Sequence, residues 1–272
     1  MDCKYIFLDI DGTLVDFQGK LADSALKALE TAKSNGHKLF VCTGRQRSQI
    51  YPWLLEKVEF DGAVCSSGAY VMADGECIAQ HCFSEYITFL SDYFTAAHTP
   101  YCVQTEHTLM LEKWCGDAIV EHYLADGIDR GKIDSLFGMT KIVESVPELT
   151  VAEKLIYYGA PKGLSDVAAD LGDRFSVVRY SFGSMGDRCG EVTDSRYTKA
   201  TGMAEILRRF DAPQSATIAF GDGDNDLEMM DFAFFGVAMG NGTPALRAAA
   251  DMVTDDINSN GLYNAFKKLG LI

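Results

Sequence analysis

The sequence predicts an α/β fold built on a parallel sheet, with a second domain inserted into it. At both ends of the chain, short continuous apolar runs alternate with helical patterns, which is typical of βαβ units whose strands are buried on both faces. The middle of the chain carries more amphipathic strand candidates, which are typical of a mostly antiparallel α+β unit. With 272 residues, 47% of them hydrophobic and 23% charged, the chain has enough apolar surface for a sizeable core.

The parallel sheet is predicted from both ends of the chain. In the N-terminal part the expected strands are 5–8, 39–42 and 63–65, and the expected helices are 26–36 and 50–58. In the C-terminal third the expected strands are 217–220, 235–239 and 252–254, with helices at 203–210, from 227, at 244–250 and at 262–269. Both ends are therefore expected to form one core domain, 1–82 with 188–272.

Residues 83–187 are predicted to form the inserted domain. Its expected strands are 101–104, 108–111, 155–158 and 176–180, with helices between them. Glycine-containing segments at 74–75 and 183–186 flank this part of the chain.

The charge balance excludes some classes of partner. The chain has 24 Lys+Arg against 39 Asp+Glu, a net charge of −15, so we expect no nucleic acid and no membrane surface as partner. No apolar stretch approaches the roughly 18–20 residues of a membrane span. The eight cysteines include no CxxC pair, and the N-terminus shows no signal peptide. A cytoplasmic location with reduced thiols is expected, and the oligomeric state is left open.

The first chemical motif, DIDGTL, begins at Asp9 directly after the first expected strand. Asp9 and Asp11, separated by one residue and followed by Gly12, can present a carboxylate and a backbone carbonyl to a hard cation. An equally good interpretation of this motif alone is an acidic turn at the end of a strand.

The second motif, Thr43-Gly44-Arg45, follows the second expected strand. It offers a hydroxyl and backbone N–H groups at the expected start of a helix, which suits a phosphate oxygen. Taken alone, a plain helix N-cap by Thr43 is the better interpretation.

The third motif, GDGDND, runs from Gly221 to Asp226 and holds three carboxylates in five residues. A calcium loop is excluded because Leu227 and Ala233 stand where that motif needs Gly and Glu. A dinucleotide-binding GxGxxG is excluded because Asp226 replaces the third glycine. Crowded carboxylates directly after a buried strand repel one another, so this motif indicates a cation.

Together the three motifs resemble the haloacid dehalogenase (HAD) superfamily of phosphotransferases. That pattern has DxDGT after the first strand, Thr or Ser after the second, a downstream lysine and GDxxND after a later strand, and Lys199 occupies the lysine position. The insertion and the endings VAMGN, at 237–241, and NGL, at 260–262, resemble the Cof-type subgroup with its class IIB cap. The resemblance implies a HAD-like fold, in which a Rossmann-like parallel sheet core carries an inserted α+β cap domain.

The resemblance also implies a Mg²⁺-dependent phosphatase that acts through an aspartyl-phosphate. Asp9 would be the nucleophile, and Asp11 would protonate the leaving alcohol and then activate water. Asp9, the backbone carbonyl of Asp11 and Asp222 would hold Mg²⁺, and Asp226 would support its water shell.

The same resemblance assigns the phosphate-binding residues. Thr43, Gly44, Lys199 and Asn225 would contact phosphate oxygens or neutralise their charge. Lys199 by itself is equally compatible with a solvated residue at a helix start. For Arg45 two interpretations stay open, a substrate contact and a surface salt-bridge partner.

The inserted domain is expected to cover the strand ends and to discriminate among leaving groups. Glu106 and His107 are candidate specificity residues in it, although an ordinary role in the fold or on the surface is the more common outcome for such residues. The favoured function is a phosphatase of small phosphorylated metabolites, with sugar phosphates the preferred class. A phosphomutase of the same superfamily is the alternative. A non-enzymatic phosphoacceptor protein is disfavoured because receiver domains are far shorter and carry the acceptor after a later strand.

Overall fold

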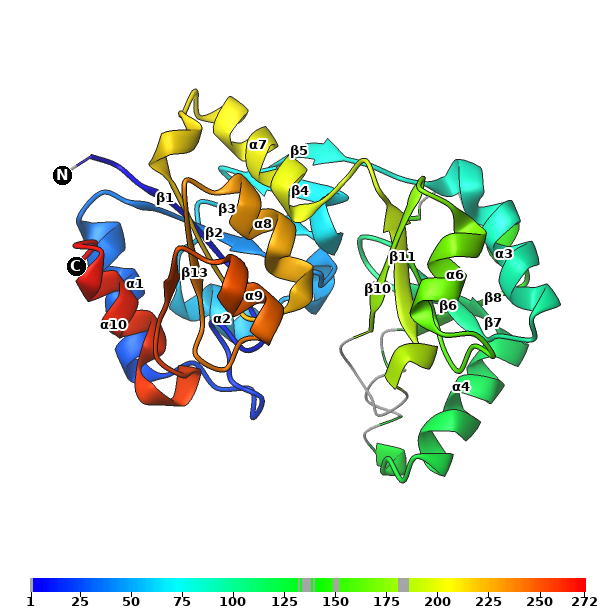
Figure 1. The fold of residues 1–272 in the computed structure, drawn as a ribbon. Coiled ribbons are helices and arrows are strands. Elements are labelled where there is room, and N and C mark those ends of the chain that lie inside the picture. Colours follow the sequence, from blue (N-terminus) through cyan, green and yellow to red (C-terminus); the bar gives the residue numbers. More distant parts are fainter. Residues whose placement is uncertain (1, 132, 134–137, 139, 149–151, 181–185) are drawn as a thin grey trace. The chain divides into compact units, whose positions relative to one another are not determined.

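The chain divides into two compact units, which are drawn in Figure 1. The computed structural model describes residues 2–131, 133, 138, 140–148, 152–180 and 186–272. Residues 1–80 and 197–272 form the core unit, and residues 81–196 form the inserted unit. The predicted α/β core with an inserted α+β domain is confirmed.

The core unit contains a sheet with the strand order β14-β13-β12-β1-β2-β3-β4-β5. Its strands are β1 (Tyr5–Leu8), β2 (Lys38–Cys42), β3 (Gly62–Cys65), β4 (Tyr70–Ala73), β5 (Glu76–Gln80), β12 (Thr217–Gly221), β13 (Phe235–Ala238) and β14 (Met252–Val253). The pairs from β14 to β3 are parallel, as expected, while β3–β4 and β4–β5 are antiparallel. The carboxyl ends of β1, β2 and β12 therefore lie at one edge of the sheet.

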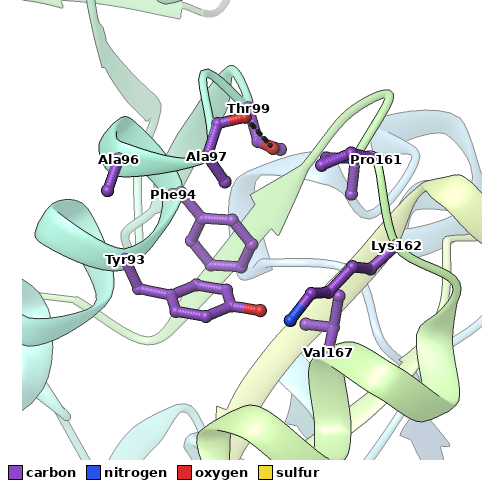
Figure 2. Close-up of a pocket in the computed structure, with 9 residues that line it drawn as sticks. Tyr93, Phe94, Ala96, Ala97, Thr99, Pro161, Lys162 and Val167 are labelled. Carbon is purple, nitrogen blue, oxygen red and sulfur yellow. Dashed lines mark hydrogen bonds between the residues drawn. The ribbon is translucent and has the colours of Figure 1, made fainter.

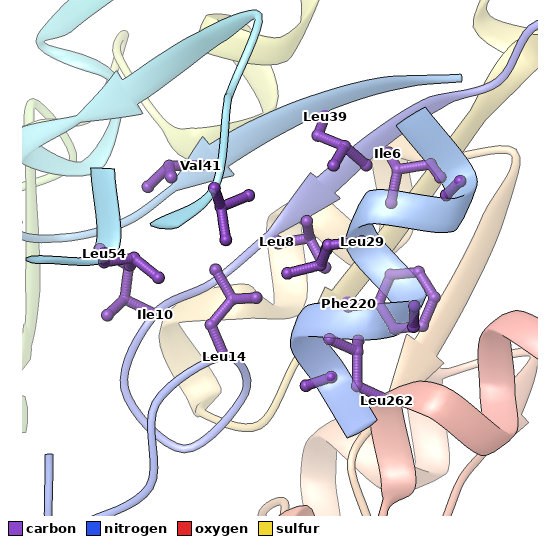
Figure 3. Close-up of a cluster of buried hydrophobic side chains, with 14 of the residues drawn as sticks. Ile6, Leu8, Ile10, Leu14, Leu29, Leu39, Val41, Leu54, Phe220 and Leu262 are labelled. Atoms are coloured by element: carbon purple, nitrogen blue, oxygen red, sulfur yellow. The ribbon is translucent and has the colours of Figure 1, made fainter. Parts of the chain in front are cut away.

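Helices cover both faces of this sheet. They are α1 (Asp23–Ser34), α2 (Pro52–Lys57), α7 (Lys199–Arg209), α8 (Leu227–Phe232), α9 (Pro244–Ala249) and α10 (Gly261–Lys268). On β1, Ile6 and Leu8 join the apolar cluster with α1 and α10, which Figure 3 shows, while Phe7 joins the cluster with α7 and α8. Each fully buried side chain of this kind stabilises the fold by about 1.5–3 kcal/mol, which explains the continuous apolar runs.

A β-hairpin, β4–β5, extends the core sheet up to Gln80, close to the expected border between residues 82 and 83. The dipeptide Asp74-Gly75, which flanks the predicted insertion on its N-terminal side, is the turn of this hairpin, and both residues have positive φ (51° and 80°). Asp-Gly is a favoured pair for a two-residue turn between antiparallel strands. The first border therefore lies after Gln80.

The inserted unit contains a sheet with the strand order β10-β11-β9-β6-β7-β8. Its strands are β6 (Tyr101–Gln104), β7 (Leu109–Glu112), β8 (Thr140–Val143), β9 (Lys154–Tyr157), β10 (Phe175–Arg179) and β11 (Gly190–Asp194), and its helices include α3 (Ile87–Ala96), α4 (Lys113–Ala125) and α6 (Leu164–Leu171). All pairs are antiparallel except β7–β8, in agreement with the mostly antiparallel prediction.

The second border differs from the expected one between residues 187 and 188. Strand β11 pairs with β9 and β10, so the inserted unit continues to Arg196. The glycine-containing segment at 183–186, which flanks the predicted insertion, lies mostly outside the described residues, since the structure describes only Gly186 of it.

Candidate active site

Two acidic motifs meet because their strands are neighbours in the sheet. β1 and β12 pair in parallel, with Leu8 opposite Phe220. Asp9 follows β1 and its backbone N–H donates to the Phe220 carbonyl at 3.0 Å, while Asp222 follows β12. The rule that side chains converge at the carboxyl ends of parallel strands therefore holds for these two motifs.

Asp9, Asp222 and Asp226 form a carboxylate cluster at this edge. One carboxylate oxygen from each residue lies within 4.8 Å of the other two. Asp226 is fully buried, and its Oδ2 accepts hydrogen bonds from the backbone N–H groups of Asp222 and Gly223, both at 3.0 Å. These backbone contacts fix the turn that leads into α8 and hold two of the three carboxylates in place.

Lys199 supplies the positive charge of the cluster. Its Nζ donates to Asp9 Oδ1 at 2.7 Å and to Asp226 Oδ1 at 2.5 Å, and its side chain is only 1% exposed. Lys199 is the first residue of α7, whose start is fixed by a capping box between Thr198 and Thr201. The structure thus places Lys199 inside the cluster and excludes the alternative of a solvated helix-start residue.

One ammonium does not balance three clustered carboxylates, two of which are buried. Burial raises the pKa of Asp9 well above its usual value, although Lys199 opposes this shift. Burial and then the neighbouring Asp226 raise the pKa of Asp222 to about 7. The pKa of Lys199 is raised by the two carboxylates, which outweigh the effect of its burial. The cluster lacks positive charge, and its oxygen donors suit a hard divalent cation.

The side chain of Asp11 points to another partner. Arg45 Nε donates to Asp11 Oδ2 at 2.6 Å and Arg45 Nη2 donates to Asp11 Oδ1 at 2.8 Å, which makes a bidentate ion pair. Asp11 is not a member of the carboxylate cluster. The sequence left two interpretations of Arg45 open, a substrate contact and a salt-bridge partner. The structure shows Arg45 in an ion pair, and the residue that it pairs with, Asp11, belongs to the first motif.

Gly12 and Asn241 hold the first motif against the third. Gly12 has a φ of +85°, and a Cβ atom there would lie 2.1 Å from Asp222 Oδ2, so only glycine fits. Asn241 Nδ2 donates to the Gly12 carbonyl at 2.8 Å, and Asn241 Oδ1 accepts from the backbone N–H of Ile257 at 2.9 Å. Thr13 Oγ1 donates to Asp222 Oδ1 at 3.1 Å. These contacts position the residues around the cluster.

Thr43 lies buried at the end of β2. Its Oγ1 accepts from the backbone N–H of Arg45 at 3.2 Å, and its carbonyl accepts from the N–H of Ser67 at 3.1 Å. The helix expected over 50–58 is present as α2 (Pro52–Lys57), so it does not begin at Thr43. A three-residue 3₁₀ turn at Arg47–Gln49 follows instead, and α2 begins only at Pro52. Thr43 and Gly44 therefore lie in a loop and not at a helix start, and their predicted contact with phosphate stays a prediction.

The remaining predicted residues lie on the surface or in the other unit. Asn225 is exposed in the turn after β12. Glu106 and His107 lie between β6 and β7 of the inserted unit, with His107 Nε2 3.6 Å from Glu106 Oε2. His107 is 75% exposed. These placements leave the predicted roles of the three residues as predictions.

Sequence reasoning missed Thr13, Asn241 and Tyr51 as contacts of the motif residues. Asn241 could have been found, because it lies in a Gly-Asn-Gly turn directly after β13, at the same sheet edge as the other motifs. Tyr51 carried no comparable signal. Its hydroxyl accepts from Arg45 Nη2 at 2.8 Å, a contact that depends on the path of the loop between β2 and α2.

A separate pocket of about 290 Å³ lies within the inserted unit (Figure 2). Its lining is mostly apolar and comes from the end of α3, the following loop, the segment after β9 and α6. The polar atoms at its rim are already paired, since Tyr93 Oη and Lys162 Nζ both donate to Asp170 Oδ2. Within the described residues, no helix is long and apolar enough to cross a membrane.

Comparison with known proteins identifies the family. The family model described as haloacid dehalogenase-like hydrolase matches residues 6–266. The YkrA protein of Bacillus subtilis (strain 168) is 28% identical over 280 residues, covering 100% of both chains. The 5-amino-6-(5-phospho-D-ribitylamino)uracil phosphatase YitU of the same organism is 27% identical over 284 residues, covering 97% of this chain and 96% of YitU.

A solved structure agrees with the sequence matches. The structure of a HAD subclass IIB sugar phosphatase superposes with a TM-score of 0.80 at 26% identity, covering 99% of this chain and 100% of that one. The family match spans nearly the whole chain, and the relatives match both the core unit and the inserted unit. The chain therefore belongs to the haloacid dehalogenase-like hydrolases, as a Cof-type phosphatase of subclass IIB.

Proposed function

We propose that the small phosphorylated metabolites on which this phosphatase acts are sugar phosphates, and that it hydrolyses them through an aspartyl-phosphate on Asp9. The observation that carries this proposal is the position of Lys199 between Asp9 and Asp226, at 2.7 and 2.5 Å. A nucleophilic carboxylate repels a phosphate dianion, so a buried cation in contact with that carboxylate lowers the barrier to their approach.

A divalent cation, Mg²⁺ in this proposal, would be held by Asp9, Asp222 and the Asp11 carbonyl, with Asp226 supporting its water ligands. When bound, it would supply the charge neutralisation that phosphoryl transfer requires. The chain's own residues prepare this site: Asp226 is fixed by two backbone N–H groups, and Asp222 is oriented by the Thr13 hydroxyl.

Asp11 is proposed as the general acid and base. Its carboxylate is 45% exposed, so it can reach a leaving-group oxygen and, after the alcohol departs, a water molecule. Thr43 and Gly44 are proposed to contact phosphate oxygens from the loop after β2, with Asn225 as a further contact from the turn after β12.

The preference for sugar phosphates is supported by the similarity to a subclass IIB sugar phosphatase over both units. The name of YitU indicates a different phosphorylated compound for that relative, so the leaving group varies among similar chains. Because the residues of the core cluster act on the phosphoryl group, selection among leaving groups is proposed for the inserted unit, with Glu106 and His107 as candidates.

The proposal is tested by phosphate release from a panel of hexose, pentose and triose phosphates and non-sugar monoesters. Asp9→Asn should abolish turnover, and excess chelator should abolish wild-type turnover until Mg²⁺ is restored. Asp224→Asn is a matched control, because Asp224 is an exposed carboxylate of the same loop that lies outside the cluster. Substantial turnover by Asp9→Asn contradicts the mechanism. A preference for non-sugar esters contradicts the substrate class.

A further inference from the structure

Arg45 holds the carboxylate that the proposed function uses as acid and base. Its Nε and Nη2 donate to the two oxygens of Asp11 at 2.6 and 2.8 Å, a parallel pair of charged hydrogen bonds. Such a fork fixes both the position and the plane of a carboxylate, which a single point contact does not. Asp11 is the third residue after β1 and, unlike Asp9, is not enclosed by the core, so it depends on such a contact for its orientation.

Arg45 is itself held on its other donors. Nη1 donates to the Gln49 carbonyl at 3.1 Å, and Nη2 donates to Tyr51 Oη at 2.8 Å. The guanidinium carbon lies 4.4 Å from the centroid of the Tyr51 ring, and that ring stacks on Trp53. Every nitrogen of the guanidinium group is therefore engaged, and the loop between β2 and α2 supplies the carbonyl and the aromatic ring that hold it.

We propose that Arg45 is a positioning residue that acts on the reaction through Asp11. The proposal rests on the proposed function, in which Asp11 exchanges a proton with the leaving group. The bidentate pair uses one lone pair on each Asp11 oxygen, and the Tyr51 hydroxyl also hydrogen-bonds this carboxylate, which leaves one lone pair for that exchange. Arg45 thereby orients the acid/base without blocking it.

This role differs measurably from the two simpler ones. A surface ion pair contributes at most about 1 kcal/mol to stability and leaves catalysis unchanged when it is removed. A direct phosphate contact affects every substrate alike, because every substrate carries the phosphate. A residue that positions the general acid affects substrates in proportion to their need for a proton on the leaving oxygen.

The test uses phenyl phosphate and p-nitrophenyl phosphate, two esters of similar size. Phenolate is the more basic leaving group and needs the proton, whereas p-nitrophenolate departs readily without it. We expect Arg45→Gln to lower kcat/KM for phenyl phosphate by about 10- to 100-fold, since misplacing a reacting group by about 1 Å can cost that much. For p-nitrophenyl phosphate, kcat/KM should stay within a few fold of the wild type.

A double-mutant cycle identifies the path of the effect. If Arg45 acts through Asp11, Arg45→Gln causes no further loss with phenyl phosphate in the Asp11→Asn background. Arg45→Lys keeps the charge but loses the fork, so it should share most of the defect. Arg209→Gln is the matched control, because Arg209 is a half-exposed arginine that pairs with Asp74 in the β4–β5 hairpin. Circular dichroism confirms that each variant is folded.

Several outcomes overturn the proposal. Equal losses on both esters with a raised KM identify a direct phosphate contact, and unchanged kinetics identify a surface ion pair. A full additional loss in the Asp11→Asn background shows that Arg45 acts elsewhere. If Asp11→Asn alone behaves as the wild type while Asp9→Asn is inactive, the acid/base assignment fails and this proposal fails with it, although the nucleophile stands. If Asp9→Asn keeps wild-type turnover, the proposed function itself fails.

Discussion

Gly12→Ala is the substitution for which the structure makes the most specific prediction. Gly12 has a φ of +85°, and its added Cβ would lie 2.1 Å from Asp222 Oδ2 and 2.5 Å from Asp222 Cγ. Asp222 cannot simply rotate away, because its Oδ1 accepts from Thr13 and the segment around it carries the cluster. Gly36 is a matched control, with a φ of +87° and no atom within 4 Å of an added Cβ.

The two substitutions separate backbone strain from the contact with Asp222. In both variants an alanine must adopt a left-handed backbone conformation, which lowers the free energy of unfolding by about 1–2 kcal/mol. The unfolding midpoint should fall by about 2–4 °C for each kcal/mol. Only in Gly12→Ala must the Asp222 carboxylate also retreat, by roughly 1 Å, which can reduce turnover by about 100-fold. Its affinity for Mg²⁺ should fall by about 10- to 100-fold, as is usual when the residues around a metal site are altered.

The assay combines three measurements on the wild type and both variants: the thermal unfolding midpoint, the Mg²⁺ affinity by calorimetry and kcat/KM for phosphate release. In the absence of metal we expect both variants to unfold below the wild type, with Gly12→Ala at or below Gly36→Ala, and a loss of Mg²⁺ affinity and activity in Gly12→Ala alone. Wild-type Mg²⁺ affinity and activity in a folded Gly12→Ala protein would refute the claim that this glycine is required by its contact with Asp222.

Two further predictions concern charged side chains of the core unit. Lys199→Met leaves the buried carboxylates of Asp9 and Asp226 without their cation. Activity should therefore be lost, and the free energy of unfolding should fall by about 3–5 kcal/mol. An unchanged unfolding midpoint would show that the lysine is not needed to balance the two carboxylates. Asp61 accepts a hydrogen bond from Lys33 Nζ at 2.7 Å. Burial alone would raise the pKa of Asp61, but its hydrogen bonds and the nearby lysines lower it. Asp61→Asn should therefore lower the free energy of unfolding by about 1–3 kcal/mol at pH 7. Because the pKa of Asp61 is lower in the folded state, this stabilisation is present above about pH 4 and is lost as the pH falls through the pKa of the folded state. Denaturant titrations at pH 3 and pH 7 measure it as the difference in unfolding free energy between Asp61→Asn and the wild type. An equal difference at the two pH values would contradict the prediction.

The core strands that carry the site could be predicted from the sequence because their signal is local. β1 and β12 are continuous apolar runs, and a strand buried on both faces of a parallel sheet requires such a run whatever its neighbours are. Asp9 and Asp222 follow these runs directly. Their convergence at one sheet edge follows from parallel topology, and the structure brings them together as predicted.

The borders of the inserted unit were less predictable because strand pairing is not local. The pattern of β11 fits either sheet, and only its hydrogen bonds to β9 and β10 assign it to the inserted unit. Likewise, Asp74-Gly75 is typical both of a domain border and of a hairpin turn. The partner strands decide between these possibilities. Strand β9, which pairs with β11, is distant from it in the sequence, and the pairing of β4 with β5 is recognised only in the folded chain.

For the site, the sequence by itself determined which residue types stand at the strand ends, and the tertiary structure decided which of them touch. The motifs placed Asp11 and Arg45 at the same edge but left the role of the arginine open. Their bidentate contact depends on the loop between β2 and α2, which contains a 3₁₀ turn that the sequence did not predict. Motif spacing specifies where a backbone segment ends, whereas side-chain contacts depend on loop conformation and on packing against Tyr51, and these are set only when the whole sheet edge is assembled.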